Sequence, residues 1–188
     1  IRPLNPYAES KYLAERILRS LPPTQMRSVI LRYFNVAAAN AHGTNGPRTK
    51  KGTHLIKVAA EAATGKRPDI SIFGEDYETS DGTPIRDYIH VQDLADIHIR
   101  AFEYLLKGGT SDLFNCGYGH GYTVKQVIQT MQNVSRAKFL TKSESRRAGD
   151  SIYLVADNTK VKQALQWSPK FDNLGVICES AFNWERNL

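Results

Sequence analysis

Short apolar runs alternate with helical stretches along this chain of 188 residues, and that alternation restricts what it can fold into. Val29 to Leu31 is a continuous apolar run, as expected of a strand buried on both faces in a parallel sheet. Such a strand needs a helix on each side. Further strands are expected at Ile70 to Phe73, Arg86 to His90 and Leu113 to Cys116. Strands that alternate with helices in this way are typical of an α/β fold.

The helices are expected from apolar spacing and from the residues at their ends. Tyr7 to Leu21 has apolar positions at helical spacing, with Asn5 as N-cap, Pro6 at the first helical position and Pro22 at the stop. Further helices are expected from His54 to Thr64, from Asp93 as a cap to Gly108, after the capping box of Thr123 and Gln126, near Asn158 to Leu165, and at the C-terminus around Ile177 and Trp184.

The composition is that of an ordinary soluble globular protein, with 41% hydrophobic and 23% charged residues. Apolar runs stay well short of the roughly 20 residues that a membrane span needs, so we expect no membrane partner. The net charge is +6, but the basic residues are scattered along the chain, which does not favour nucleic-acid binding.

Cysteines and histidines give no sign of a metal site. Cys116 and Cys178 lie far apart without ligand spacing and have apolar neighbours, which favours reduced, buried thiols in a cytoplasmic protein. His90, His98 and His120 do not form ligand pairs with a nearby Cys, Asp or Glu, and we interpret them as structural.

Tyr7 and Lys11 stand four residues apart at the start of the first expected helix. That spacing places the phenol and the ammonium on one helix face, where the cation favours loss of the phenol proton. A tyrosine in this setting can act as a general base on a sugar hydroxyl. A solvated amphipathic face explains the same spacing, so the pair alone leaves both interpretations open.

Several longer motifs follow in order. They are Asn5-Pro6-Tyr7-Ala8-Glu9-Ser10-Lys11, Leu31-Arg32-Tyr33-Phe34-Asn35, Phe73-Gly74-Glu75-Asp76-Tyr77, Asp81-Gly82-Thr83, Arg86-Asp87-Tyr88-Ile89-His90-Val91 and Asp93-Leu94-Ala95. In this arrangement, from residue 5 to about residue 184, the chain closely resembles the UDP-glucose 4-epimerases, which belong to the extended short-chain dehydrogenase/reductases. Two alternatives stay open. One is another NAD-dependent nucleotide-sugar enzyme, a dehydratase or decarboxylase, which shares Tyr7 and Lys11 but lacks the run from Asp76 to His90. The other is a non-catalytic remnant that binds UDP.

The resemblance implies an NAD-dependent isomerase and assigns its catalytic residues. Tyr7 would remove the proton of the sugar 4-hydroxyl while NAD takes the C4 hydride, and Lys11 would bind the nicotinamide ribose. The 4-keto sugar then turns over in its pocket and receives the hydride on its other face. Tyr33 matches a position that contacts the cofactor.

The resemblance also implies a set of contacts to the UDP-sugar. Arginine suits a diphosphate because its guanidinium is planar and permanently charged. The implied contacts are Asn35 near the diphosphate, His54 and Leu55 at the nucleotide, Ser71 and Phe73 beside the uracil, Arg86 and Arg147 at the diphosphate, and Asp150 at the uridine ribose.

One feature of the family is missing from this sequence. Members carry about 150 residues of a Rossmann domain before the tyrosine motif, including the glycine-rich turn for the NAD pyrophosphate. No Gly-x-x-Gly-x-x-Gly follows a strand here, so the chain is expected to be the C-terminal portion of an epimerase, inactive by itself.

The expected fold is the C-terminal part of a Rossmann-type parallel sheet interleaved with a smaller α/β substrate-binding domain. Residues 1–36 and 86–122 would belong to the NAD-binding domain, and residues 37–85 and 123–188 to the UDP-sugar-binding domain. The resemblance implies a homodimer at full length, formed through helices that include the one carrying Tyr7. It does not choose between UDP-glucose and UDP-N-acetylglucosamine.

Overall fold

A computed structural model describes residues 3, 5–49 and 52–188 of the protein. Its first helix, α1 (Pro6–Ser20), begins and ends where its flanking residues predict. The Asn5 side chain accepts a hydrogen bond of 2.8 Å from the Ala8 amide, and Pro6 occupies the first turn, where no backbone donor is needed. The helix ends ahead of Pro22, which confirms the predicted stop.

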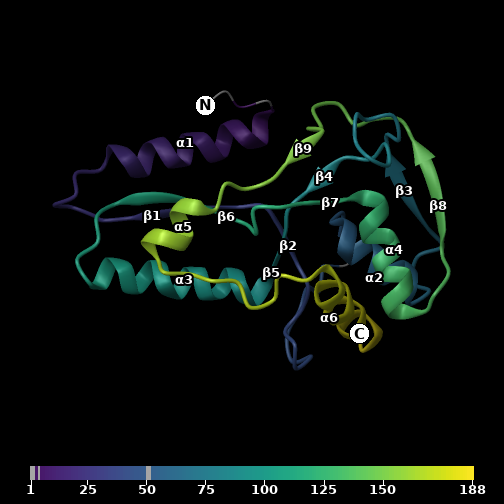
Figure 1. Ribbon diagram of the computed structural model, residues 1–188. Helices are drawn as coiled ribbons and strands as arrows, with labels where there is room; N and C mark the ends of the chain where they lie inside the picture. The colour runs from purple at the N-terminus through teal and green to yellow at the C-terminus, as the bar shows by residue number, and fades with distance from the viewer. Residues whose placement is uncertain (1–2, 4, 50–51) are drawn as a thin grey trace.

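The sheet half of the molecule is built on two parallel strand pairs. β1 (Val29–Tyr33) pairs with β6 (Asp112–Cys116), and β2 (Asn35–Ala37) pairs with β5 (Tyr88–His90). In Figure 1, α1 runs along one side of the β1–β6 pair and α3 along the other. α3 spans Val91–Leu106, and the short α5 spans Thr159–Ala164 and packs on β6. Parallel strands joined through helices confirm the predicted α/β class.

β1 is less buried than its apolar sequence predicted. Its first four residues are half-buried and Tyr33 is 55% exposed, so the expectation of a strand buried on both faces was wrong. The physical reason is the small sheet: within the described residues, β1 has a partner strand on one edge only, β6. A two-stranded pair leaves strand edges and faces open to solvent.

The other half combines short strands with three packed helices. Its strands are β3 (Asp69–Phe73), β4 (Ile85–Arg86), β7 (Tyr122–Thr123), β8 (Leu140–Glu144) and β9 (Tyr153–Leu154), and its helices are α2 (Leu55–Ala63), α4 (Val124–Ser135) and α6 (Leu174–Arg186). β3 pairs with β8 in parallel, and β4 lies between antiparallel β7 and parallel β9. The three helices contact one another, and α2 also contacts β3.

Three strands of this half were not predicted. β8 has the sequence Leu-Thr-Lys-Ser-Glu and is exposed at every position, so it shows neither an apolar run nor alternation. β7 and β9 have two residues each. Pairing with β3 and β4, which are remote in sequence, makes these segments strands, and single-sequence patterns do not report such pairing.

The cap of α3 also differs from the sequence expectation. His90 is the N-cap, and its Nδ1 accepts a hydrogen bond of 3.1 Å from the Gln92 amide. Asp93 lies in the first turn and is buried, where its carboxylate accepts bonds from the Lys170 and Phe171 amides. The predicted cap at Asp93 was therefore wrong, because tertiary contacts engage that carboxylate. His90 has a structural role, as predicted.

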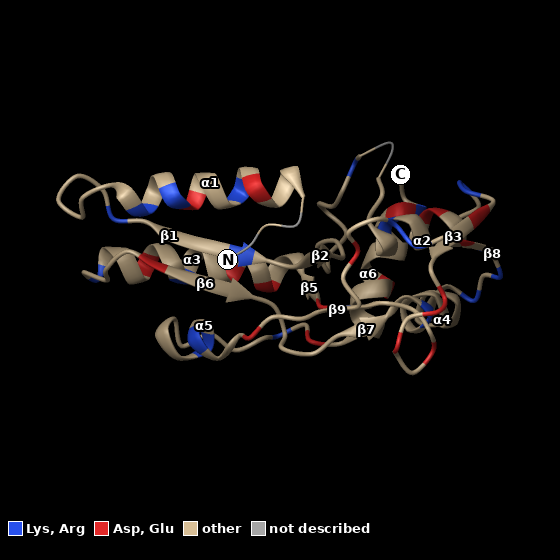
Figure 2. Ribbon diagram, turned by 90° about the horizontal axis from the view of Figure 1, so that it is seen from above, with Lys and Arg blue, Asp and Glu red and all other residues tan. Residues whose placement is uncertain are grey.

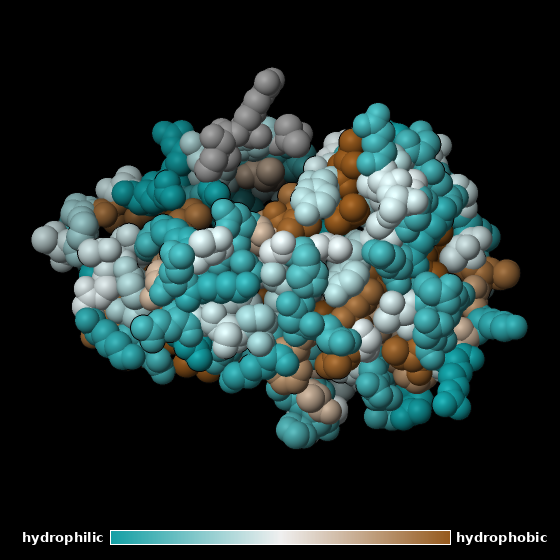
Figure 3. Space-filling model, in the orientation of Figure 1, coloured by the Kyte–Doolittle hydropathy of each residue, from teal (hydrophilic) through white to brown (hydrophobic). Residues whose placement is uncertain are grey.

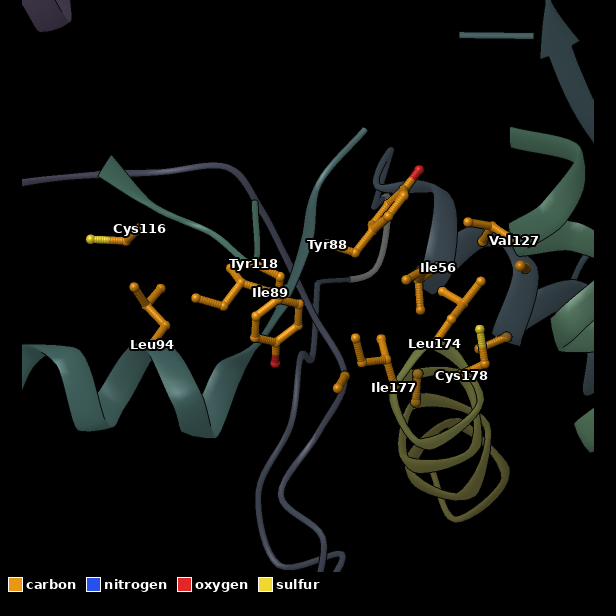
Figure 4. Close-up of a cluster of buried hydrophobic side chains, with 14 of the residues drawn as sticks. Ile56, Tyr88, Ile89, Leu94, Cys116, Tyr118, Val127, Leu174, Ile177 and Cys178 are labelled. Carbon is orange, nitrogen blue, oxygen red and sulfur yellow. The ribbon is translucent and has the colours of Figure 1, made fainter. Parts of the chain in front are cut away.

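One apolar core joins the two halves. Figure 4 shows Leu94 and Cys116 on the side of α3 and the sheet, and Ile56 and Ile177 on the side of the helices. Ile89 of β5 lies between these groups and is fully buried. Both cysteines are buried free thiols, which agrees with the prediction. Burial raises the pKa of each thiol to about 12.

The surface is mixed in character. Lys, Arg, Asp and Glu are spread over both halves (Figure 2), and apolar and polar residues are interspersed on the face shown in Figure 3. α1 and α3 expose several large apolar side chains, namely Leu13, Ile17, Ile99, Phe102 and Leu106. Among the described residues, every helix is too short or too polar to cross a bilayer.

Candidate active site

Tyr7 and Lys11 share one face of α1, as their spacing predicted. The Lys11 ammonium nitrogen lies 5.2 Å from the centre of the Tyr7 ring, and the Tyr7 side chain is 72% exposed. Both residues stand in the first turns of the helix. In Figures 1 and 2 this end of α1 is the one nearer to the half that carries β3, β4 and β9.

A partly buried ion pair fixes α1 to β1 close to the next predicted site residue. Arg32 of β1 binds Glu15 of α1 through two bonds, with Nε 2.6 Å from Oε1 and Nη2 2.5 Å from Oε2. This side-chain pairing lowers the pKa of Glu15. Tyr33 follows Arg32 directly, so one bidentate contact sets the helix of Tyr7 against the strand that ends at Tyr33.

A second group of site residues is assembled around β3. Ile70 and Ile72 face the core, which leaves Ser71 and Phe73 together on the other face, because side chains alternate along a strand. The guanidinium carbon of Arg147 lies 3.6 Å from the centre of the Phe73 ring. The structure therefore brings Phe73 and Arg147 together across 74 positions of sequence.

Arg86 joins this half through β4, the central strand of its small sheet. Its Nη2 lies 3.5 Å from Oδ1 of Asp150, and the Arg86 side chain is only 13% exposed. The chain after Asp150 lines up along β4, because the Ile85 amide donates to the Ile152 oxygen at 2.9 Å. That backbone pairing delivers Asp150 to Arg86.

Asn35 is placed beside the same strand. The backbone amide of Asn35 donates a 3.0 Å hydrogen bond to the backbone oxygen of Asp87, so β2 begins next to the residue that follows Arg86. His54 and Leu55 lie elsewhere, at the N-cap and the first position of α2. The helix that they begin, α2, contacts β3, the strand of Ser71 and Phe73.

Asp87 holds the strand of Arg86 in place, and sequence reasoning did not single it out. Its buried carboxylate accepts bonds from the amides of Tyr118, Gly119 and Ala156, at 3.0, 3.1 and 3.2 Å. Burial raises the pKa of Asp87, and the three amides oppose that effect. A Cβ on Gly117 would lie 2.4 Å from Asp87 Oδ2, so this turn needs glycine. The glycine-punctuated sequence from Gly117 was the available signal.

Two hollows on the surface are lined by other residues, and Tyr122 in the second is the strand partner of Arg86. One is lined by Arg100, Tyr104, Gly109 and Gln166, among others, and the second by Tyr122, Gln126 and Asn173 with their neighbours. His, Cys, Asp and Glu do not gather into a metal-binding group within the described parts of the chain. The candidate residues thus form two groups, one at Tyr7 on α1 and one around β3 and β4.

Comparison with known proteins identifies the class to which this fold and these residues belong. Residues 1–117, more than half of the chain, match the NAD dependent epimerase/dehydratase family. The chain belongs to that family.

Comparison with individual relatives narrows the resemblance within this family. The chain is 50% identical over 187 residues to a UDP-glucose 4-epimerase of Azospirillum brasilense, covering 99% of this chain and 54% of the relative. It is similar to the solved UDP-Glc/GlcNAc 4-epimerase of Campylobacter jejuni, with 47% identity and a TM-score of 0.79, over 100% of this chain and 57% of that one.

A third similar structure is the UDP-glucose 4-epimerase of Bifidobacterium longum, solved in complex with NAD+ and UDP. It is 33% identical with a TM-score of 0.91, over 97% of this chain and 55% of that one. The chain thus spans about half the length of the relatives it matches.

Proposed function

We propose that this chain is the C-terminal portion of a UDP-glucose 4-epimerase, which interconverts UDP-glucose and UDP-galactose, and that it carries the UDP-sugar-binding residues and the catalytic tyrosine. The observation that carries the proposal is the group of Phe73, Arg86, Arg147 and Asp150. Three segments of the chain, namely β3, β4 and the loop after β8, deliver these side chains to two contacts, a stacked guanidinium and an ion pair. Relatives that are named as this enzyme, and of which this chain spans about half the length, support it.

The chemistry of the group suits a uridine diphosphate. A diphosphate carries about two negative charges and planar acceptor pairs, which guanidinium groups bind in a bidentate manner. Arg86 is mostly buried and is held by Asp150, so it loses little side-chain freedom on binding. Phe73 offers a flat apolar ring for a base, and Ser71 lies on the same face of β3.

In the proposed reaction, Tyr7 holds and moves a proton. Its exposed side-chain oxygen would accept the proton of the sugar 4-hydroxyl, and the Lys11 ammonium lies on the same helix face, 5.2 Å from the ring centre. When bound, NAD would take up the C4 hydride and return it to the other face of the sugar. Lys11 and Tyr33 would hold the nicotinamide end.

The described residues fit only part of that cofactor. Tyr7 and Tyr33 are 72% and 55% exposed, which leaves both free to meet a nicotinamide ribose. A pyrophosphate is usually held by a glycine-rich turn at a helix N-terminus, and the sequence offers no such turn after a strand. We therefore propose that NAD binding needs the further part that the relatives have. Homodimer formation and a cytoplasmic location are proposed for the whole protein.

Calorimetric titration of the 188-residue chain with UDP tests the binding part of the proposal. We expect UDP to bind with a stoichiometry of one and uridine to bind more weakly, since uridine lacks the diphosphate. The absence of UDP binding would contradict the proposal. The chain extended by the further segment that the relatives have should convert UDP-glucose to UDP-galactose, and a dehydrated or decarboxylated product would favour the alternative class instead.

A further inference from the structure

We propose that Arg146 is a positioning residue, which sets Arg147 and Asp150 in their places by fixing the segment after β8 to the segment after β3. This inference rests on the proposed function, because Arg147 and Asp150 are the groups assigned there to the diphosphate and the ribose. Arg146 itself would not touch the substrate.

Arg146 makes three separate contacts with the segment after β3. Its Nε donates a 2.7 Å bond to Oδ1 of Asp76, and its Nη2 donates to the Asp76 backbone oxygen. Its guanidinium carbon lies 4.1 Å from the centre of the Tyr77 ring, and Tyr77 is buried. One planar group thus satisfies a carboxylate, a carbonyl and an aromatic face at once.

The contacts of Arg146 require a glycine at position 74. It has φ +84°, and a Cβ there would lie 2.6 Å from the Tyr77 ring and 2.7 Å from Cγ of Arg146. Its amide also donates a 2.9 Å bond to the Glu144 oxygen, which continues the β3–β8 ladder by one step. The backbone bond and the Arg146 contacts therefore fix the same two segments at successive points.

Fixing Arg146 also restricts the positions of Arg147 and Asp150, the two neighbouring residues proposed to contact the substrate. Arg146 and Arg147 are neighbours, and their guanidinium groups lie on different rings, those of Tyr77 and Phe73. Beyond them the chain turns, with a 3.3 Å bond from the Asp150 amide to the Arg147 oxygen. That turn brings Asp150 to Arg86.

The ion pair between Arg146 and Asp76 is exposed, so an orienting role can be distinguished from a contribution to stability. The side chains of Arg146 and Asp76 are 44% and 75% exposed, and ion pairs at such sites contribute little to the free energy of unfolding. A role in orienting the loop should therefore appear in UDP affinity and loop mobility much more than in the melting temperature.

The test compares Arg146→Ala with Lys138→Ala, which removes the same charge from an exposed position just before β8. By calorimetry, Arg146→Ala should weaken UDP binding by about tenfold, which corresponds to losing about 1.4 kcal/mol of oriented charge-assisted bonding. Lys138→Ala should bind UDP as the parent does. Arg146→Lys keeps the charge without the planar fork and should rescue only part of the affinity.

A double-mutant cycle tests whether Arg146 acts through its neighbour. In the Arg147→Ala background, Arg146→Ala should have little further effect on UDP affinity, because the group it orients is gone. Full additivity of the two changes, or an equal loss in Lys138→Ala, would overturn the proposal in favour of a general charge effect.

Limited digestion with trypsin gives a readout that does not need UDP. Arg146→Ala should increase the rate of cleavage after Arg147 several-fold, because the loop is released, whereas Lys138→Ala should not change it. An unchanged rate would overturn the positioning role. If the parent chain bound no UDP, the proposed function would fail, and the digestion would still decide how Arg146 acts.

Discussion

Tyr7 and Arg147 are presented to solvent in different ways, and the difference suits different tasks. Tyr7 stands 72% exposed on a helix, with a lysine 5.2 Å from its ring. Arg147 is stacked on Phe73, where the ring restricts the plane of its guanidinium. An open phenol can meet a reacting hydroxyl, whereas a stacked guanidinium is prepared to hold a charged group. Changes at the two residues should therefore affect different steps.

Tyr7→Phe should lower turnover without affecting nucleotide binding. In the full-length enzyme we expect kcat to fall by about 10²–10⁴-fold, because the change removes the proton acceptor. The affinity for UDP should stay close to that of the parent protein, since the change leaves Arg86 and Arg147 in place. Steady-state kinetics and calorimetry check the two parts, and a large loss of UDP affinity would contradict the assignment.

Arg147→Ala should show the opposite pattern. We expect UDP affinity to fall about tenfold or more, because a charge-assisted contact to the diphosphate is lost. Uridine lacks the diphosphate, so its affinity should change much less. Parallel titrations with UDP and uridine measure this difference, and equal losses for both ligands would place Arg147 at the nucleoside instead.

α3 begins at a titratable cap, which is the main feature at the scale of elements. His90 Nδ1 accepts from the Gln92 amide, so the proton of the neutral ring is on Nε2, which is buried without a partner among the described residues. The ring is stacked on Phe171 with centres 4.5 Å apart. Burial lowers the pKa of His90 from its ordinary value of 6.5, against the attraction of Asp93.

This cap predicts a loss of stability in mild acid. As the pH falls below about 6.5, the unfolded chain takes up a proton at His90 that the folded protein does not yet bind, so the free energy of unfolding decreases. The slope can reach about 1.4 kcal/mol per pH unit until the folded-state pKa is passed. Urea unfolding measured from pH 8 to pH 5 gives this slope.

His90→Asn supplies the matched variant, since asparagine also accepts a cap bond but does not titrate. It should flatten the pH dependence between pH 7 and pH 5. The exposed His42 serves as the control, and His42→Asn should leave the slope as in the parent protein. A slope that survives His90→Asn would show that other groups carry the acid sensitivity.

At the scale of the whole molecule, the two halves differ in how complete they are. The helical half packs α2, α4 and α6 around a shared core. The sheet half has β1 paired on one edge only, within the described residues, and exposes Ile99, Phe102 and Leu106 on α3. We propose the division given by residues 1–36 and 86–122 for the NAD-binding domain and by 37–85 and 123–188 for the UDP-sugar-binding domain.

The chain by itself should bind UDP but neither retain NAD nor turn over substrate. We expect the purified 188-residue chain to carry no stoichiometric NAD, because its sequence offers no glycine-rich turn for the pyrophosphate. Absorbance of the heat-released supernatant and an epimerase assay check this. Copurified NAD, or conversion of UDP-glucose to UDP-galactose, would contradict it. Addition of the upstream segment found in relatives should restore both properties.

The sequence alone determined the local features, because they depend on neighbouring residues. Asn5, Pro6 and the capping box of Thr123 lie next to the helices they begin, and the apolar runs that begin near Val29, Ile70 and Leu113 marked strands. The segment from Arg86 to His90 was expected as one strand, which was wrong, because the chain there changes from β4 to β5 and so from one sheet to another. The motifs also indicated the family, and the residues of its site stay a prediction. Spacing within one helix was enough to place Tyr7 and Lys11 on one face.

Only the tertiary structure decided the contacts between distant segments. β8 has no apolar pattern, and it is a strand because β3 pairs with it. Asp93 was expected to cap a helix, but amides more than 70 positions away engage its carboxylate, and His90 takes that place. The position of Arg146 likewise depends on contacts with Gly74 and Tyr77. The physical reason is that hydrogen bonds and packing act through distance in space, whereas a sequence pattern reports only neighbours along the chain.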